Sequence, residues 1–234
     1  MRALRILLIV AVVLGGLFVA ADRLAVGMAE SEAADKIKSS EGLTETPDVS
    51  IKGFPFLTQA LSRELDEVDV TMNGVTASSA GRSLRISRLT AELRDVKLND
   101  SFSSAVADSA TGSAHLGYDD LSQASSEGVA VSYGGRDQAG KSQVKVTAGV
   151  SILGRTVKRS VLSTVSVTGD DTIRLHADDI PGAGIPGLEN LVRGKIDFDR
   201  KIDGLPEGMK LDKVVTTQDG VDVSVVGRQV ELAG

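Results

Sequence analysis

Gly53-Phe54-Pro55-Phe56-Leu57-Thr58-Gln59 is the stretch around which the fold of this chain is organised. The chain has five phenylalanines, and two of them flank a single proline here. Pro55 fixes its own φ angle and favours an extended conformation at Phe54. We therefore expect a rigid corner that presents two rings and Leu57. The rings either fill the core, which is the more common outcome, or line the mouth of an apolar cavity.

Composition indicates a β-rich domain and argues against several classes of function. Of 234 residues, 41% are hydrophobic and 25% are charged, which is typical of a globular domain. Only 3% are aromatic, so the core depends on Val, Leu and Ile, which favour β structure. A net charge of −6 does not fit a nucleic-acid-binding surface. Because the chain has no cysteine, disulfides, thiol catalysis and zinc–thiolate sites are excluded.

The N-terminus has the layout of an export signal. Arg2 and Arg5 precede an uncharged run, residues 6–21, that is about 24 Å long as a helix. A full membrane span needs about 20 apolar residues, so residues 1–21 are either a cleaved signal peptide or a signal anchor. Small residues at the end of the run offer a cleavage site. In both cases the positive charges predict a cytoplasmic N-terminus, with residues 22–234 outside as a single domain.

The body of the chain is predicted to be one helix followed by many strands. Residues 22–40 read as a helix that either packs its small side chains on a sheet or forms a stalk above the membrane. From residue 49 onward, segments alternate aliphatic and polar side chains, which is typical of antiparallel sheet with one wetted face. A change in parity between 86 and 98 suggests a bulge or bend. Turns are predicted at Asn73-Gly74, Gly134-Gly135, Asp170-Asp171 and Asp219-Gly220, and short helices at 57–65, 119–125 and 188–193.

Residues 49–75 carry a family resemblance. The run Val49-x-Ile51-x-Gly53-Phe54-Pro55-Phe56-Leu57-Thr58-Gln59 is followed by Leu65-Asp66-x-Val68-x-Val70 and Asn73-Gly74-Val75. This pattern resembles the LmeA-like phospholipid-binding family of actinobacteria, whose members are exported. Residues 112–121 are similar to a second element of that family, a strand that ends in a tyrosine before a short helix. The resemblance extends from about residue 25 to the end, although Arg63 stands where many relatives have glycine.

The number of strands decides the predicted architecture. Two or three short helices cannot cover the apolar side of so much sheet, and exposed apolar area of this size would aggregate. We therefore predict an α+β, β-rich fold in which a large curved antiparallel sheet wraps around a long N-terminal helix. The resemblance implies that the sheet forms an elongated lipid groove, similar to tubular lipid-binding folds. An ordinary β-sandwich with a dry core is the alternative that periodicity leaves open.

The resemblance also implies the function, and the corner at 53–59 suggests the site. It implies an exported phospholipid-binding protein, not an enzyme, that serves cell-envelope lipid or lipoglycan assembly. The expected location is the cell envelope or the outer face of the cytoplasmic membrane, with the protein anchored or secreted. The expected partners are the membrane and a phospholipid of phosphatidylinositol type, with no nucleic acid and no cofactor. The alternative is a membrane-tethered structural or protein-interaction β domain with a dry core. Residues expected to contact lipid are Phe54, Phe56, Leu57, Leu61, Val70 and Met72, with Lys52 and Arg63 as head-group candidates.

Motifs that suggest catalysis or metal binding lack the context they need. Residues 182–187 match the G-x-G-x-x-G fingerprint of dinucleotide sites, but prolines and antiparallel strands replace the βαβ unit that this site requires. The run His-Ala-Asp-Asp at 176–179 offers too few metal ligands. Aspartates between 197 and 203 lack the remaining ligands of a calcium loop. With two scattered histidines and no cysteine, no catalytic triad can be assembled, so we expect no catalytic or metal-binding residues.

Overall fold

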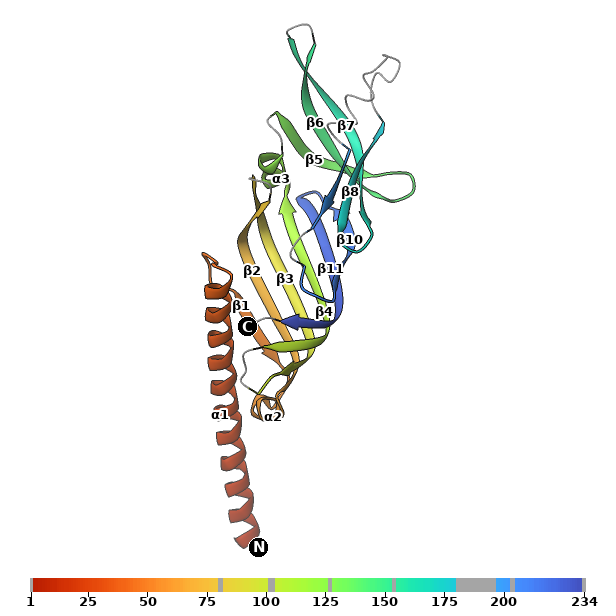
Figure 1. Cartoon of the computed structure of the whole chain (residues 1–234). Helices are drawn as coiled ribbons and strands as arrows, with labels where there is room; N and C mark the ends of the chain where they lie inside the picture. Colours follow the sequence, from red (N-terminus) through yellow and green to blue (C-terminus); the bar gives the residue numbers. More distant parts are fainter. Residues whose placement is uncertain are drawn as a thin grey trace. The chain divides into compact units, whose positions relative to one another are not determined.

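The computed structural model describes residues 2–79, 82–100, 104–125, 128–152, 155–179, 197–202 and 205–232. Within these residues the chain forms three helices and eleven strands (Figure 1). The helices are α1 (Arg2–Ser40), α2 (Phe56–Ser62) and α3 (Tyr118–Ala124). The strands are β1 (Asp48–Lys52), β2 (Glu64–Ser79), β3 (Arg82–Leu98), β4 (Ala105–Gly117), β5 (Val129–Arg136), β6 (Ser142–Ile152), β7 (Arg155–Thr168), β8 (Thr172–Asp179), β9 (Phe198–Lys201), β10 (Met209–Thr216) and β11 (Gly220–Leu232).

The strands form two antiparallel sheets. One sheet has the strand order β1-β2-β3-β4-β11-β10, and the other has the order β5-β6-β7-β8-β9. The predicted α+β, β-rich fold with antiparallel strands and a long N-terminal helix is therefore confirmed. The division of the strands between two sheets depends on which strands pair. Side-chain alternation along a single strand carries no information about pairing.

The chain divides into two compact units, each with an apolar cluster of its own. The first unit contains residues 1–71, 91–110 and 228–234, and the second contains residues 72–90 and 111–227. In the first unit the buried cluster consists of Val26, Phe56, Leu65, Val96 and Ala107. In the second unit it consists of Val144, Val146, Val161, Ala177, Val214 and Val221. Burying a side chain of valine or phenylalanine size stabilises a fold by about 1.5–3 kcal/mol.

Helix α1 has two halves with different surroundings. Its first half, residues 2–21, is exposed throughout, and the helix is long and apolar enough to cross a membrane. Its second half packs on the first unit, because Val26 and Ala34 are buried and lie on one helical face. The carboxylate of Glu30 also accepts the backbone N–H of Ile51 in β1 at 2.8 Å. Residues 22–40 therefore pack against the domain, as the first of the two interpretations of this helix predicts.

Two of the three predicted short helices and two of the four predicted turns are confirmed. Helices α2 and α3 lie at the predicted places, and Asp170-Asp171 separates β7 from β8. Asp219-Gly220 leads from the connection after β10 into β11. Asp95 in β3 has a φ of 50°, where the parity of the apolar side chains changes. The predicted helix at 188–193 and the glycine motif at 182–187 lie outside the described residues.

The other two turn predictions are wrong. Asn73-Gly74 lies inside β2, where Gly74 has a φ of 64°. Gly134-Gly135 lies inside β5, opposite a shift in the register with β6. A glycine with positive φ inside a strand is typical of a β-bulge, so the same dipeptides that favour hairpin turns serve here to bend strands that continue. At Gly134 a side chain would also come within 2.6 Å of the carbonyl carbon of Val144.

Candidate lipid-binding site

The corner at 53–59 is fixed by glutamine hydrogen bonds. Gln59 is buried in α2, and its Nε2 donates to the carbonyl oxygen of Lys52 at 3.2 Å. Its Oε1 accepts the backbone N–H of Asp66 at 2.9 Å. The side chain therefore joins the end of β1 to the start of β2. Gly53 has a φ of 92°, and a Cβ atom there would collide with the Gln59 amide, so the close approach requires glycine.

Asp22 of α1 caps helix α2 from outside. The residue before α2 is Pro55, which provides no capping side chain. Instead, Asp22 Oδ1 accepts the backbone N–H of Leu57 at 2.8 Å, and Oδ2 accepts a hydrogen bond from Arg23 at 2.7 Å. Asp22 is fully buried in the described structure. Burial by itself favours the neutral acid, but the N–H groups of Leu57 and Phe56 and the Arg23 guanidinium together lower the pKa of Asp22.

This lowered pKa predicts an acid-sensitive attachment of α2 to α1. An acid whose pKa is lower in the folded protein stabilises the fold above its ordinary pKa, here 3.8, and that contribution is lost as the pH falls through the folded value. We therefore expect the amides of Phe56 and Leu57 to lose protection from hydrogen exchange below pH 3.8. In Asp22→Ala the same amides should exchange faster at neutral pH too, and the acid step at these amides should disappear. An unchanged acid step in Asp22→Ala would contradict the assignment.

The two rings of the corner have opposite environments. Phe56 is 8% exposed and belongs to the buried cluster of the first unit. Phe54 is 57% exposed, and the Arg23 guanidinium lies 5.2 Å from the centre of its ring. A cation in this position is attracted to the face of the ring. The core interpretation therefore holds for Phe56, whereas Phe54 lies at the surface.

The remaining predicted site residues are spread over the molecule. Leu57 and Leu61 of α2 are exposed, whereas Val70 of β2 is buried. Met72 is half-buried and belongs to the second unit. Lys52 lies 3.4 Å from Asp69, and Arg63, with a φ of 59°, ends α2 and pairs with Asp100. The structure thus exposes Phe54 just before α2 and Leu57 and Leu61 on it, and it gives both head-group candidates a carboxylate partner.

The second unit presents an aliphatic face that the predicted site did not include. In β5, β6, β7 and β8, cross-strand pairs such as Val131 with Val146 and Val165 with Leu175 place aliphatic side chains on one side of the sheet. The other side is polar, with hydrogen bonds such as Thr147 to Ser160. Beside the buried cluster, part of the aliphatic face is only half-buried. The half-buried members are Val129, Val131, Val165, Val167, Ile173 and Leu175. The alternation of aliphatic and polar residues along these strands is the sequence signal that could have identified this face.

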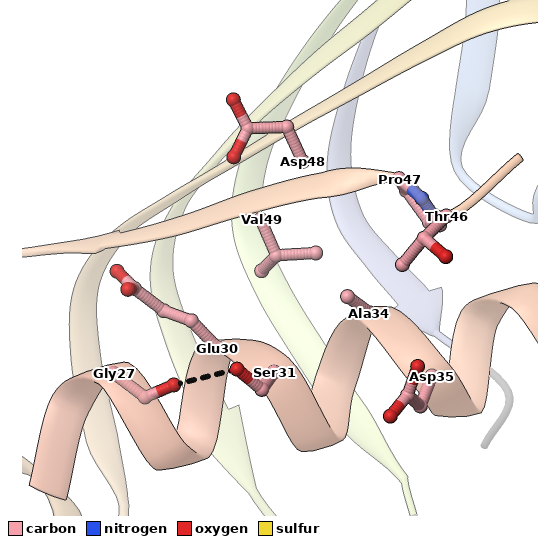
Figure 2. A pocket seen from close by; sticks show the side chains of 9 residues that line it. All are labelled: Gly27, Glu30, Ser31, Ala34, Asp35, Thr46, Pro47, Asp48 and Val49. Atoms are coloured by element: carbon pink, nitrogen blue, oxygen red, sulfur yellow. Dashed lines mark hydrogen bonds between the residues drawn. The ribbon is translucent and has the colours of Figure 1, made fainter.

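A cavity beside α1 in the first unit is polar. It has a volume of about 410 Å³ and lies between α1 and the chain around β1 (Figure 2). Glu30, Asp35 and Asp48 place three carboxylates around it, with only small apolar side chains such as Ala34 and Val49 between them. Acyl chains prefer apolar walls, and a phosphate would be repelled by the carboxylates. The cavity therefore fits neither end of a phospholipid.

Both histidines and several other titratable groups of the described residues have structural partners. His115 Nδ1 lies 2.6 Å from Asp222, and His176 Nδ1 lies 3.0 Å from Asp197. Asp199, one of the discounted calcium ligands, receives two hydrogen bonds from Arg174, which lower its pKa. Among the described residues, no group of three or more His, Cys, Asp or Glu side chains could hold a metal ion. Burial raises the pKa of Tyr118 to about 12, and its hydroxyl donates to the Thr217 carbonyl at 2.7 Å.

The fold and these surfaces define a β-rich protein with an apolar N-terminal helix and aliphatic side chains that are only partly covered. A family model described as LmeA-like phospholipid-binding matches residues 20–226. The chain therefore belongs to the LmeA-like phospholipid-binding family, and this membership supports lipid binding. No curated protein matches the chain, and no solved structure does.

Proposed function

We propose that this protein is an exported, membrane-anchored protein that holds the acyl chains of a phospholipid against an apolar surface. The observation that carries the proposal is the family match, which spans residues 20–226 and so covers most of both units. The family supplies lipid binding, and the finer statements about chain contacts, anchoring and location are our inference. We further propose that the protein acts without catalysis in the assembly of cell-envelope lipids or lipoglycans.

The half-buried aliphatic face of β5–β8 is our proposed contact surface for acyl chains in the second unit. Its half-buried side chains come from β5, β7 and β8, the buried Val144 and Val146 of β6 belong to the same face, and none of these side chains is charged. Each methylene that leaves water contributes about 0.8 kcal/mol, so a few buried methylenes supply useful affinity without any head-group contact. In the first unit we propose Phe54, Leu57 and Leu61 as lipid contacts. Phe56 and Val70 would support them from the core.

The N-terminal segment supports the proposed location. Residues 6–21 are uncharged and fully exposed as a helix, which is unfavourable in water and favourable in a bilayer. By the positive-inside rule, Arg2 and Arg5 at its start support a cytoplasmic N-terminus, with residues 22–234 on the outer side of the membrane. A phosphatidylinositol-type head group is the proposed ligand. Lys52 and Arg63 remain candidates for its phosphate, provided that the lipid displaces Asp69 and Asp100 from them.

Co-purified lipid tests the proposal directly. The full chain would be expressed in a host with phosphatidylinositol, purified in mild detergent, extracted with organic solvent and analysed by mass spectrometry. We expect about one phospholipid per chain, enriched in phosphatidylinositol over the detergent extract of control membranes. Absence of bound phospholipid, together with no uptake of a fluorescent phospholipid, would favour the alternative of a tethered β domain with a dry core.

A photoactivatable phospholipid can then locate the acyl chains. A lipid that carries a diazirine near the end of one chain would be bound to the protein, irradiated and mapped by peptide sequencing. Adducts on β5–β8, at Val131, Val165 or Leu175, are the expected result. A lipid with the diazirine on its head group serves as the matched control and should label other peptides. Equal labelling by both lipids would contradict a defined orientation of the bound chain.

A further inference from the structure

Helix α2 carries an apolar stripe that faces away from the protein. Leu57 and Leu61 lie one turn apart on α2, Phe54 lies just before the helix, and the exposed fractions of Phe54, Leu57 and Leu61 are 57%, 36% and 86%. The opposite side of α2 holds Phe56, Gln59 and Ala60, which pack into the first unit. Three large apolar side chains exposed within eight residues are unfavourable in water, and such a patch is typical of a surface that a partner covers.

The position of α2 along α1 identifies that partner. The uncharged run of α1 ends at Ala21, and the next residue, Asp22, is the one that accepts the backbone N–H of Leu57. Arg23 follows and lies over the ring of Phe54. Figure 1 shows α2 alongside α1, with the first half of α1 continuing beyond it. The patch therefore lies at the level where the apolar helix ends, within a residue or two of its first charged side chain.

The charges around the patch suit a lipid surface. The negative charge of Asp22 is compensated by Arg23 and by backbone N–H groups. Lys52 and Arg63, on either side of the corner, are paired with Asp69 and Asp100. Each of the three cations around the patch, Arg23, Lys52 and Arg63, therefore has a carboxylate partner. Attraction to the patch must therefore come from apolar burial, with weak dependence on anionic lipid.

We propose that Phe54, Leu57 and Leu61 form a bilayer-contact patch, which enters the head-group and upper acyl region of the outer leaflet while Asp22 holds it at that depth. The inference rests on the proposal that residues 6–21 stay in the membrane as an anchor. A phospholipid bilayer is favoured over a protein partner because Asp22, the residue directly after the anchor, is hydrogen-bonded to Leu57 of the patch. The patch therefore lies where the anchor leaves the membrane. The patch then touches the lipid layer from which the protein would take its ligand.

The absence of cysteine from the chain makes the depth of the patch measurable, because a single introduced thiol is the only site of labelling. Leu61→Cys would be labelled with an environment-sensitive fluorophore in the full chain and reconstituted in phosphatidylcholine vesicles. Leu14→Cys marks the anchor, and Ser40→Cys, about 27 Å along the helix from Asp22, marks the water side. Nitroxide lipids that carry the quencher in the head group or deep in the acyl chain report the depth of each label.

We expect the label at Leu61 to shift its emission to the blue and to be quenched most by the shallow nitroxide. The label at Leu14 should be quenched most by the deep nitroxide, and the label at Ser40 by neither. Adding Asp22→Ala should reduce the shallow quenching at Leu61 without changing that at Leu14. A label at Leu61 that behaves like the one at Ser40 overturns the proposal.

Other outcomes are equally decisive. If the label at Leu61 is shielded in detergent in a concentration-dependent way and is not quenched in vesicles, a second copy of the chain covers the patch and the proposal is wrong. If the full chain does not float with the vesicles, the anchor and the patch both fail. Phospholipid binding in detergent is measured separately, so its failure would overturn the proposed function while the depth measurement still decides on the patch.

Discussion

Phe56→Ala is expected to lower the free energy of unfolding of the first unit by about 3–5 kcal/mol, because it removes a ring from a closely packed cluster. Phe56 is 8% exposed and packs with Val26, Leu65, Val96 and Ala107. Neighbouring side chains from a helix and three strands cannot all move to fill the space. Hydrogen exchange of β2 amides in urea, with the full chain in detergent, measures the loss for this unit.

Phe54→Ala is the matched control, since it removes the same ring two residues earlier. Phe54 is mostly exposed and contacts Arg23, so its loss should cost about 1 kcal/mol or less. Equal losses in the two variants would mean that both rings belong to the core. In that case the bilayer-contact patch would lose its largest member.

The different burial of Phe54 and Phe56 could not be predicted from the sequence. The Phe-Pro-Phe pattern predicted a rigid corner, and the structure has one. Which ring is buried depends on where α2 begins. Because it begins at Phe56, this ring and Ala60 share the face that packs into the unit, while Phe54 lies before the first turn. The start of α2 is fixed by Asp22 and Gln59, and neither contact can be read from local spacing.

Strand formation was predictable because it is local, and strand pairing was not. Alternating side chains predicted long antiparallel strands, and the structure has them. The pairing of β4 with β11 joins segments that are about a hundred residues apart in the chain. The two wrong turns have the same origin, since Gly74 and Gly135 have the positive φ that their sequence suggests but lie in strands that continue. The sequence therefore indicates the backbone conformation of each glycine. Whether that glycine ends a strand or bends one depends on how the strand pairs with its neighbours.

Asp22 was missed because its sequence context suggests only the end of an apolar run. A charged residue after such a run ordinarily marks the edge of a membrane segment. Its second role, capping α2, needs a contact across 35 residues of sequence. The signal that could have suggested it is the absence of a capping side chain at Pro55, which leaves the first N–H groups of α2 in need of an acceptor.

Val26→Asp should have a comparably large effect and should separate α1 from the first unit. Val26 is 7% exposed in the same cluster as Phe56, and no cation belongs to that cluster. An uncompensated carboxylate in such a place costs about 3–5 kcal/mol. The fold can avoid this cost by releasing residues 22–40 from β1. We therefore expect faster tryptic cleavage after Lys36 and Lys38, measured on the full chain in detergent.

Two further variants show whether the charge at position 26 or the loss of the valine side chain causes the separation of α1 from the first unit. Met28→Asp changes an apolar residue of the same helix that is 75% exposed, so it should alter stability by about 0.5 kcal/mol or less. Equal effects at positions 26 and 28 would mean that α1 is a free stalk. Val26→Asn introduces a polar group without a charge. Because burial raises the pKa of a carboxyl group, the defect of Val26→Asp should diminish as the pH falls toward 5, whereas that of Val26→Asn should not. The native attachment through Asp22 weakens only at still lower pH, because the pKa of Asp22 is lowered and not raised. Titration can therefore distinguish the carboxyl group of Asp22 from the one introduced at position 26.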